Sequence, residues 1–244
     1  MDISIIITVY NYASYIEECI NSCLMQNETP LRYEVIVVDD GSTDETPLIL
    51  NGLKNKLLRK FRIENSGIEI ASNFGFSKAK GDFIVRVDAD DKLLPNYLYY
   101  MHKNLAKEYD FYYSDYKVIN ADGKVVSSMN LPDFNAAEIR KRGDFLATGT
   151  LFSAEVLKNF RYYSEMTMNS GLENYELILQ FLEAEKLGNH IPQYLFCYRQ
   201  HSLNISKSKK DEIIRNGGML FKRFGLGMYC TNEYHPYNPT RNLP

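Results

Sequence analysis

The feature of this sequence that most constrains its fold is a series of short apolar segments, rich in β-branched residues, that alternate with segments of helical periodicity. The first apolar run, residues 3–9, reads Ile-Ser-Ile-Ile-Ile-Thr-Val. Near-continuous apolarity of this kind is typical of a strand that is covered on both faces in a parallel sheet. Apolar side chains then recur at helical spacing from Ile16 to Leu24, and a second apolar run follows at 33–38. The chain is therefore expected to begin with a strand, a helix and a second strand.

The same alternation continues as far as residue 87. The pattern predicts a helix that begins at Thr43 or Asp44 and runs through 53, a short strand at 61–63, a helix over 67–79 and a strand at 83–87. Strands that alternate with helices in this way favour an α/β fold, with a mostly parallel sheet and helices on both of its faces. Sheets of this kind bind ligands beyond the carboxyl ends of their strands.

Clusters of polar residues fall at those strand ends. Residues 8–11 (Thr-Val-Tyr-Asn) end the first strand, residues 39–42 (Asp-Asp-Gly-Ser) follow the second, and residues 88–91 (Asp-Ala-Asp-Asp) follow the fourth. We expect these three loops to converge on one crevice, because the carboxyl ends of parallel strands meet at the same edge of a sheet. The glycine patterns of dinucleotide-binding folds and of P-loops are absent from the sequence. A nucleotide bound here would be held in another way.

The second half of the chain is expected to be mixed rather than doubly wound. A helix from Pro95 to about residue 108 precedes two strand-like segments, 109–118 and 124–128, and the turn sequence Asn-Ala-Asp-Gly between them predicts a hairpin. The pattern further predicts a strand at 149–152, a helix over 172–186, a strand at 189–198, and a helix up to residue 224 that is followed by an extended arm.

Composition and charge exclude several classes of protein. The formal net charge is −3 at pH 7 and no long run of Lys or Arg occurs, so we expect no binding to nucleic acid. The four cysteines match neither a zinc-binding pattern nor a disulfide framework, which indicates thiols in a reducing compartment. The N-terminal apolar run is too short for a signal peptide, and no stretch approaches the roughly 18 apolar residues of a membrane span. A soluble, cytoplasmic protein is expected.

The acidic cluster at 88–91 is the most informative of the polar loops. Like charges this close together are tolerated when something offsets their repulsion, and a divalent cation that carries a phosphorylated ligand does so directly. Mg²⁺ or Mn²⁺ suits such a site, because these ions often take only one or two protein carboxylates and complete their shell with phosphate and water. The alternative is a solvated acidic turn after a strand.

Taken together, these residues resemble the family 2 glycosyltransferases of the GT-A fold, of the inverting type found in bacterial surface-glycan synthesis. The resemblance extends from about residue 3 to residue 206. Residues 7–11 match the family's opening strand and turn, residues 37–44 match its acidic turn, and residues 88–91 match its metal motif.

The resemblance implies a nucleotide-binding role for several residues. Thr8, Tyr10 and one of Asp39 or Asp40 would contact a nucleobase, most often uracil, whose N3–H can donate to a carboxylate. Asn65 lies in a segment that resembles the one leading into the family's metal motif, and it would contribute to the donor site.

The resemblance also implies a metal and diphosphate site. Asp88 would touch the ribose or the donor sugar, Asp90 would ligate the Mn²⁺ or Mg²⁺ that bridges the diphosphate, and Asp91 would be a further ligand or a sugar contact. His201 matches a late motif of the family whose histidine completes the metal or diphosphate site; the alternative is a surface histidine after a strand. Arg199 and Lys207 are candidates for the diphosphate, or else solvated surface charges.

One position departs from the family's pattern. An inverting transfer needs a base that takes the proton of the acceptor hydroxyl, and relatives usually carry Glu-Asp where this chain has Glu173-Asn174. Three accounts fit: Glu173 is the base, the acceptor needs little help, or activity has been lost. We favour Glu173. The alternative for Glu173 and Glu176 is a pair of solvated acids at the start of a helix, stabilised by its dipole.

The resemblance thus implies a metal-dependent inverting glycosyltransferase. It would move a sugar from a nucleotide donor, most often a UDP-sugar, onto a glycan or a lipid-linked glycan in surface polysaccharide biosynthesis. Residues 1–206 would form the GT-A domain, with a nucleotide-binding half at 1–94 and an acceptor half at 95–206. Residues 207–244 would form a C-terminal helix and tail that packs on the core, forms a homodimer, or rests on the inner face of the cell membrane.

Two other functions are alternatives to this interpretation. A catalytically silent subunit that binds a sugar nucleotide or acts as a scaffold would explain Asn174. A sugar nucleotidylyltransferase also handles nucleotides with an α/β sheet and a metal, but it is expected to have a glycine-rich basic loop after the first strand. Residues 10–14 (Tyr-Asn-Tyr-Ala-Ser) form no such loop.

Overall fold

The computed structural model describes residues 1–27, 29–142, 148–164, 171–202, 204 and 209–229. Lys207, a sequence-based candidate for the diphosphate, and Cys230 lie outside these residues. The described strands are β1 (Ile3–Val9), β2 (Tyr33–Asp39), β3 (Leu58–Arg62), β4 (Phe83–Asp88), β5 (Lys92–Leu93), β6 (Phe111–Ile119), β7 (Val125–Met129), β8 (Leu151–Ser153) and β9 (Gly188–Arg199). The described helices are α1 (Ile16–Leu24), α2 (Thr46–Gly52), α3 (Ile68–Lys78), α4 (Tyr97–Asn104), α5 (Ala136–Arg142), α6 (Ala154–Asn159), α7 (Glu173–Glu183) and α9 (Lys210–Arg223).

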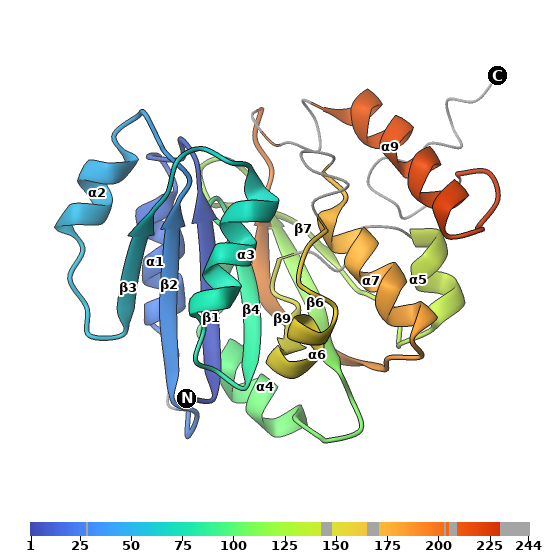
Figure 1. The fold of residues 1–244 in the computed structure, drawn as a ribbon. Helices are drawn as coiled ribbons and strands as arrows, with labels where there is room; N and C mark the ends of the chain where they lie inside the picture. The colour runs from blue at the N-terminus through green and yellow to red at the C-terminus, as the bar shows by residue number, and fades with distance from the viewer. Residues whose placement is uncertain (28, 143–147, 165–170, 203, 205–208, 230–244) are drawn as a thin grey trace.

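Strands β1 to β4, in the first half of the chain, form an all-parallel part of a single sheet (Figure 1). β1 lies between β2 and β4 and is parallel to both, and β3 extends the sheet on the far side of β2, again in parallel. Parallel neighbours need crossover connections, which α1, α2 and α3 supply. The carboxyl ends of these strands point upward in Figure 1.

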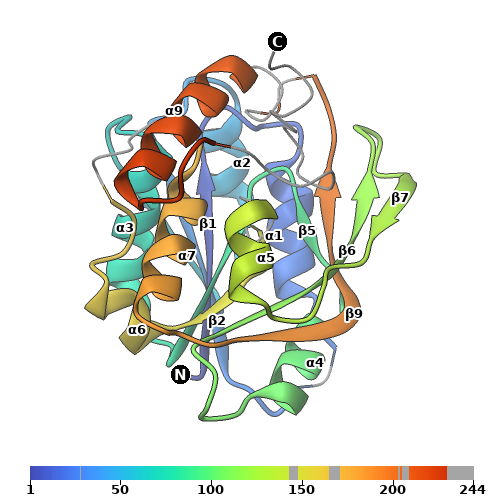
Figure 2. The same ribbon diagram turned by 90° about the vertical axis from the view of Figure 1, so that its right-hand side faces the viewer.

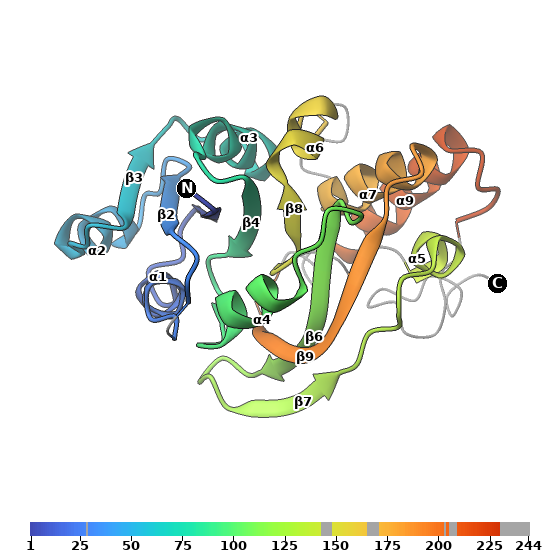
Figure 3. The same ribbon diagram turned by 90° about the horizontal axis from the view of Figure 1, so that it is seen from below.

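The two faces of this sheet are covered by different helices, as Figure 3 shows by looking along the strands. Ile5 and Ile7 of β1 pack into one apolar cluster with Ile16 and Ile20 of α1. Ile6, which points to the opposite face, packs into a second cluster that contains Phe76 of α3. Burial of each such side chain contributes roughly 1.5–3 kcal/mol. Double coverage explains why β1 is apolar at nearly every position instead of at every second one.

The second half of the chain adds strands of both directions. β8 pairs antiparallel with β4 and with β6, and β9 pairs parallel with β6. β7 forms an antiparallel hairpin with β6, and the short β5 pairs antiparallel with β9. Because β5 follows β4 directly in the chain but pairs with β9 at the end of the strand order, the sheet curls back on itself. Figure 2 shows β9 running from α7 toward this region.

The observed elements confirm the predicted fold class, a mostly parallel α/β sheet with helices on both faces and a mixed second half. Some bounds differ from the predictions. α4 ends at Asn104 instead of near 108, because the hydroxyl of Tyr112 in β6 bonds the backbone N–H and C=O of Ala106 and ties this segment to the sheet. β3 begins three residues earlier than predicted, at Leu58. β5, α5 and α6 were not predicted, because two- to seven-residue elements carry little periodicity.

The C-terminal helix α9 packs against α7 (Figure 1). Ile213, Leu220 and Phe221 of α9 share an apolar cluster with Tyr175 and Leu179 of α7. Of the three arrangements considered for this segment, the structure thus shows packing on the core for α9. The division of the chain at residue 206 stays a prediction. Among the described residues, none of the helices combines the length and apolarity that crossing a bilayer requires.

Candidate active site

The register of the sheet brings the three polar loops to one edge. Val9 pairs with Asp39 across β1 and β2, and Thr8 pairs with Asp88 across β1 and β4. Neighbouring strands lie roughly 5 Å apart, so the loops that follow β2 and β4 begin about two strand spacings from each other. The predicted convergence of these loops is therefore observed in the backbone itself.

Asn11, which sequence analysis did not single out, joins the first two loops. Its side-chain oxygen accepts a hydrogen bond from the N–H of Thr43 at 2.7 Å, and its own N–H donates to Oγ of Ser42 at 3.0 Å. The φ of Asn11 is 59°, a conformation that asparagine adopts more readily than most residues. Tyr10, next to Asn11, has 44% of its area exposed, whereas Thr8 is buried.

Asp39 is buried at the end of β2 and ties the acidic turn together. Its Oδ1 accepts from the N–H of Ser42 at 2.8 Å, and its Oδ2 accepts from the half-exposed guanidinium of Arg62 at 2.7 Å. A carboxylate has about four acceptor positions, so one hydrogen bond to each oxygen leaves capacity for a further donor.

Asp40 is also buried, but it faces the start of α3. Its carboxylate accepts from the N–H groups of Ser66 at 2.8 Å and Gly67 at 3.0 Å. The side-chain amide of Asn65 donates to the carbonyl of Asp40 at 3.0 Å. Burial raises the pKa of Asp40, and the two backbone hydrogen bonds offset part of that shift. Asn65 therefore lies next to the acidic turn, as expected, and its amide supports Asp40.

The acidic cluster after β4 is a packed part of the molecule. Asp90 and Asp91 are buried, which excludes the solvated acidic turn. Burial raises the pKa of Asp91 well above its usual value, and the charges of Asp90 and Asp88 raise it further. Burial and then the charge of Asp88 raise the pKa of Asp90. Asp88 is more exposed, and its Oδ2 accepts from the hydroxyl of Thr148 at 2.7 Å.

His201 reaches the acidic cluster from the end of β9. Its ring nitrogen Nε2 lies 2.8 Å from Oδ2 of Asp90. Its backbone N–H donates to the side-chain oxygen of Asn204 at 2.6 Å. The amide of Asn204 in turn donates to Oδ2 of Asp90 at 3.3 Å. The ring of His201 packs against the ring of Tyr15, with centroids 5.0 Å apart. His201 is buried, so it is not a surface histidine.

The carboxylates of the acidic cluster and the imidazole of His201 suit a hard divalent cation that is also held by phosphate oxygens. The described residues contain no group of three or more His, Cys, Asp or Glu side chains arranged to hold a metal by themselves. Asp90 and His201 nevertheless converge, and Oδ2 of buried Asp91 has no hydrogen-bond partner in the described part of the chain. Mg²⁺ often keeps only one or two protein carboxylates and binds phosphate and water besides. Repulsion within the cluster favours a positive charge at the same place.

Arg199 has contacts that differ from those expected of a diphosphate ligand. It is almost fully buried, and its guanidinium donates to the carbonyls of Asp90 and Ala121 and to the carboxylate of Glu18. The backbone N–H of Arg199 donates to Oδ1 of Asp91 at 2.7 Å. Arg199 thus joins α1, the β6–β7 turn and the acidic cluster. It is not a solvated surface charge, and its observed contacts are those of a support for the site.

Glu173 and Asn174 begin α7 and are both buried. Oε1 of Glu173 accepts from the guanidinium of Arg86 at 3.2 Å, and a second nitrogen of Arg86 lies 3.1 Å from Oδ1 of Asp88. Asn174 accepts a hydrogen bond from the hydroxyl of Tyr163. Glu173 therefore connects through Arg86 to the acidic cluster. Neither it nor Glu176, which is also buried, is a solvated acid at a helix start.

Two of the residues that complete this site, Arg86 and Thr148, were missed by sequence analysis. Arg86 had a detectable signal, because it interrupts the apolar run 83–87 and a guanidinium inside a covered strand needs a buried anion. Thr148 had none, because a single hydroxyl in a loop says nothing about its partner.

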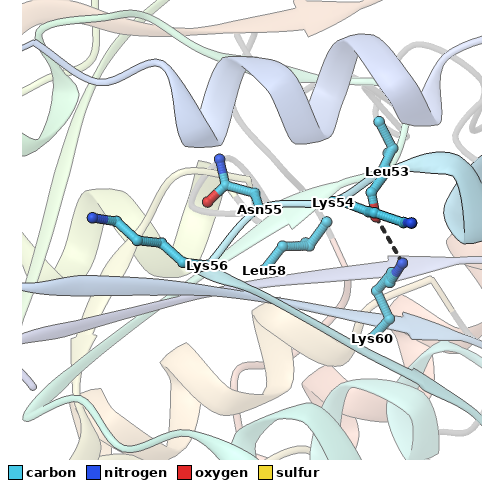
Figure 4. A pocket seen from close by; sticks show the side chains of 6 residues that line it. All are labelled: Leu53, Lys54, Asn55, Lys56, Leu58 and Lys60. Carbon is cyan, nitrogen blue, oxygen red and sulfur yellow. Dashed lines mark hydrogen bonds between the residues drawn. The ribbon is translucent and has the colours of Figure 1, made fainter.

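A separate hollow of about 460 Å³ lies on the outer edge of the sheet, between α2 and β3 (Figure 4). Leu53, Leu58, Asn55 and three lysines line it. One of these, Lys60, donates to the carbonyls of Leu50 at 2.6 Å and Leu53 at 2.8 Å. Strands β2 and β1 separate β3 from the acidic cluster after β4, so this hollow is not part of the candidate site.

The chain matches the family model described as "Glycosyl transferase family 2" over residues 4–160. It is 30% identical over 258 residues to the hyaluronan synthase of Pasteurella multocida, an alignment that covers 98% of this chain and 25% of that protein. The chain thus spans about a quarter of the length of this relative.

Two solved structures share the fold. A crystal structure of S. aureus TarS 1–349 in complex with UDP-GlcNAc has a TM-score of 0.72 and 21% identity, over 93% of this chain and 67% of that one. The mannosyltransferase PcManGT of Pyrobaculum calidifontis, in complex with GDP-Man and Mn²⁺, has a TM-score of 0.68 and 16% identity, over 97% of this chain and 67% of that one. The predicted GT-A fold is confirmed by these similarities.

Proposed function

Because this chain belongs to glycosyltransferase family 2, we propose that it transfers a sugar from a nucleotide-sugar donor to a glycan or lipid-linked glycan acceptor, with inversion at the anomeric carbon. One observation carries this proposal: an acidic cluster and two polar loops lie together at one edge of the sheet. The register of the strands aligns them, and His201 contacts Asp90 there. A nucleoside diphosphate needs both parts, a pocket for its base and a site that offsets its charge.

The nucleoside would lie over the loops after β1 and β2. Tyr10 offers an exposed ring at this edge, and Asp39 keeps acceptor capacity for a base N–H. We propose a UDP-sugar as the donor, because uracil carries one N–H that a single carboxylate can accept. The TarS structure contains UDP-GlcNAc, and PcManGT contains GDP-Man. A guanine nucleotide is therefore the alternative that an experiment must include.

The diphosphate would lie at the acidic cluster, where Asp90 and His201, with Asp91, would hold Mn²⁺ or Mg²⁺. When bound, the cation would stabilise the negative charge that grows on the departing diphosphate. Asp88, the most exposed carboxylate of the three, would face the ribose or the donor sugar. Arg199 would keep the cluster in place from behind, because its nitrogens donate to the backbone and side chains of this loop.

Glu173 would take the proton of the acceptor hydroxyl. It begins α7 close to Asp88, to which Arg86 links it. Inversion requires the base to lie on the face of the sugar opposite the diphosphate. The similarity to hyaluronan synthase supports a growing polysaccharide as the acceptor class.

Release of the nucleoside diphosphate from a panel of donors tests this proposal. Purified protein with Mn²⁺ would be incubated with UDP-GlcNAc, UDP-glucose, UDP-galactose and GDP-mannose, and UDP or GDP release would be measured. We expect turnover of at least one UDP-sugar. If no donor is bound or turned over, the proposed function is wrong. Tight binding without turnover would instead identify a silent sugar-nucleotide-binding subunit.

The role of Glu173 is tested by Glu173→Gln, which keeps the shape of the side chain. We expect kcat to fall by about 10²–10⁴-fold, the usual contribution of general-base catalysis, while the affinity for UDP stays within about twofold. Glu183→Gln is the matched control, because Glu183 is exposed near the far end of the same helix. Equal turnover in Glu173→Gln and the wild type would remove Glu173 from the mechanism.

A further inference from the structure

Arg86 is a buried cation inside an otherwise apolar strand. Only 3% of it is exposed, and its guanidinium packs over the ring of Tyr163, 5.5 Å from the centroid. Two of its nitrogens pair with different carboxylates, one with Oε1 of Glu173 at 3.2 Å and one with Oδ1 of Asp88 at 3.1 Å. A planar guanidinium can hold two carboxylates in fixed positions, which a lysine ammonium on a flexible stem does less well. Arg86 therefore connects the two sides of the proposed reaction.

Tyr163 fixes the orientation of the Asn174 amide. Its hydroxyl donates to Oδ1 of Asn174. The amide nitrogen consequently turns the other way and donates to Oε1 of Glu173 at 3.4 Å. Tyr163 is itself held in place by Asn73 of α3, which exchanges two 2.9 Å hydrogen bonds with the Tyr163 backbone. The donor group of Asn174 thus faces the carboxylate beside it.

The two oxygens of Glu173 consequently differ. Oε1 accepts from both Arg86 and Asn174, whereas Oε2 has no hydrogen-bond partner among the described residues. Only 5% of Glu173 is exposed, so bulk water competes little for the unpaired oxygen. A buried acceptor without a partner is costly, and such a group is expected where a ligand supplies the missing donor.

We propose that Arg86, Asn174 and Tyr163 are positioning residues that hold Glu173 by Oε1 and present Oε2 to the acceptor hydroxyl, with Arg86 also fixing Asp88 on the donor side. This inference rests on the proposed function. The proposed arrangement explains in physical terms why asparagine stands at position 174, where relatives usually carry aspartate. An aspartate at 174 would place a second carboxylate about 3.4 Å from Oε1 of Glu173, and like charges this close disfavour ionisation of both groups. Asparagine at 174 instead gives Glu173 a hydrogen-bond donor and adds no such repulsion.

The charged groups around Glu173 come from three elements of the described chain. β4 contributes Arg86 and, behind it, Asp88. One turn further along α7, Glu176 pairs with Arg223 of α9. These groups stay the same in the variants at position 174, so a change in pH dependence there reports on the new carboxylate.

The first test is the pH profile of kcat/KM for Asn174→Asp. The probe is nucleoside diphosphate release from the donor of the panel that the wild type turns over fastest, with Mn²⁺ and with water in place of the acceptor. The base acts when it is deprotonated. A neighbouring carboxylate therefore moves the acidic limb of the profile to higher pH, and we expect a shift of about one unit or more. Tyr163→Phe, which frees the amide to turn, should move the limb in the same direction by a smaller amount.

The second test asks whether Arg86 acts through Glu173. Arg86→Lys keeps the charge but loses the two-ended contact, and we expect kcat to fall about 10-fold or more in the wild-type background and less than twofold in the Glu173→Gln background. Arg59→Lys is the matched control, because Arg59 also pairs with a buried glutamate, Glu34, at 2.6 Å, near the start of the sheet strands. It should change stability without changing the pH profile.

The outcomes separate the inference from the proposed function. If the wild type turns over no nucleotide sugar, both are wrong. If the wild type is active and Asn174→Asp raises activity at neutral pH with an unmoved acidic limb, position 174 is the site of a lost base and the inference is wrong. A third outcome is that Arg86→Lys lowers kcat equally in both backgrounds while the acidic limb of Asn174→Asp stays in place. The network would then have only a structural role, and the inference would be wrong.

Discussion

At the scale of single residues, the three carboxylates after β4 have the same chemistry but different surroundings. Asp88 is partly exposed and pairs with Arg86 and Thr148. Asp91 is almost fully buried and holds the backbone of Arg199. Of these three carboxylates, Asp90 is the one that lies against His201, just after β9, with its Oδ2 2.8 Å from Nε2 of the histidine. Asp90 is therefore the side chain best placed to share a cation with His201.

This difference leads to a prediction for Asp90→Asn. The amide keeps the size of the side chain but removes its charge, so we expect the affinity for UDP in the presence of Mn²⁺ to fall about 10–100-fold. Chelation of the metal with EDTA should weaken UDP binding by the wild type to a similar degree and have little further effect on the variant. Calorimetric titration measures both. Asp211→Asn on the exposed side of α9 is the control, and manganese dependence equal to that of the wild type in Asp90→Asn would contradict the assignment.

At the scale of elements, a buried polar network joins the starts of the strands, opposite the site. Oγ of Ser4 in β1 donates to Glu34 of β2 and accepts from the N–H groups of Lys80 and Gly81 before β4. Arg59 of β3 pairs with the same glutamate. A Cβ on Gly81 would lie 2.5 Å from the nitrogen of Ser4, so the turn approaches β1 as closely as glycine permits. This network joins the same strands, β1, β2 and β4, whose register aligns the polar loops at the other end.

The network makes a prediction about pH and stability. Burial by itself would raise the pKa of Glu34, but hydrogen bonds from Arg59, Ser4 and the N–H of Lys80 outweigh it and lower the pKa. A lowered pKa contributes stability above the unfolded value of about 4.3, and this stability is lost as the pH falls through the lower, folded value. Glu34→Gln should therefore reduce the free energy of unfolding by about 1–3 kcal/mol at pH 7.

Urea unfolding at several pH values checks this prediction. The difference between wild type and Glu34→Gln should shrink once the pH falls below about 4, because the wild-type carboxylate then also becomes neutral. A difference that stays constant from pH 7 to pH 3 would mean that shape, and not charge, accounts for the loss.

At the scale of the whole molecule, the C-terminal helix supports the helix that carries Glu173. The packed side of α9 covers Tyr175 and Leu179 of α7, and Arg223 pairs with Glu176. α7 therefore begins at the candidate site, and α9, which lies later in the chain, covers the part of its surface that includes Tyr175 and Leu179. Without α9, the apolar side chains of this cluster would face water.

This arrangement predicts opposite outcomes for two residues of α9. Phe221 is 3% exposed within the shared cluster, and Met219 is 61% exposed two positions earlier. Phe221→Ser should lower the free energy of unfolding by about 3–5 kcal/mol, as large-to-small changes of buried aromatic residues do, whereas Met219→Ser should stay within about 0.5 kcal/mol of the wild type. Denaturant unfolding measures both, and similar values for the two variants would show that α9 does not pack on α7 in solution.

Local sequence patterns were enough to predict the alternation of strands and helices in the first half of the chain and the edge of the sheet where the polar loops lie. These features depend on local properties, since β-branched runs form strands and polar residues follow where a covered strand ends. The acidic cluster, the late histidine and the departure at Asn174 could likewise be recognised from nearby residues.

The pairing of charged groups, in contrast, could be seen only in the folded chain. Arg86 and Glu173 are 87 residues apart, and Arg199 lies 181 residues from Glu18. Nothing local indicates these pairs, because the partner of a buried charge depends on which segments the curled sheet brings together. The same reason explains β5, whose two residues form a strand only because β9 supplies the hydrogen bonds. A buried charge is stable only with its partner in place, so this chain's fold and its proposed chemistry depend on the same contacts.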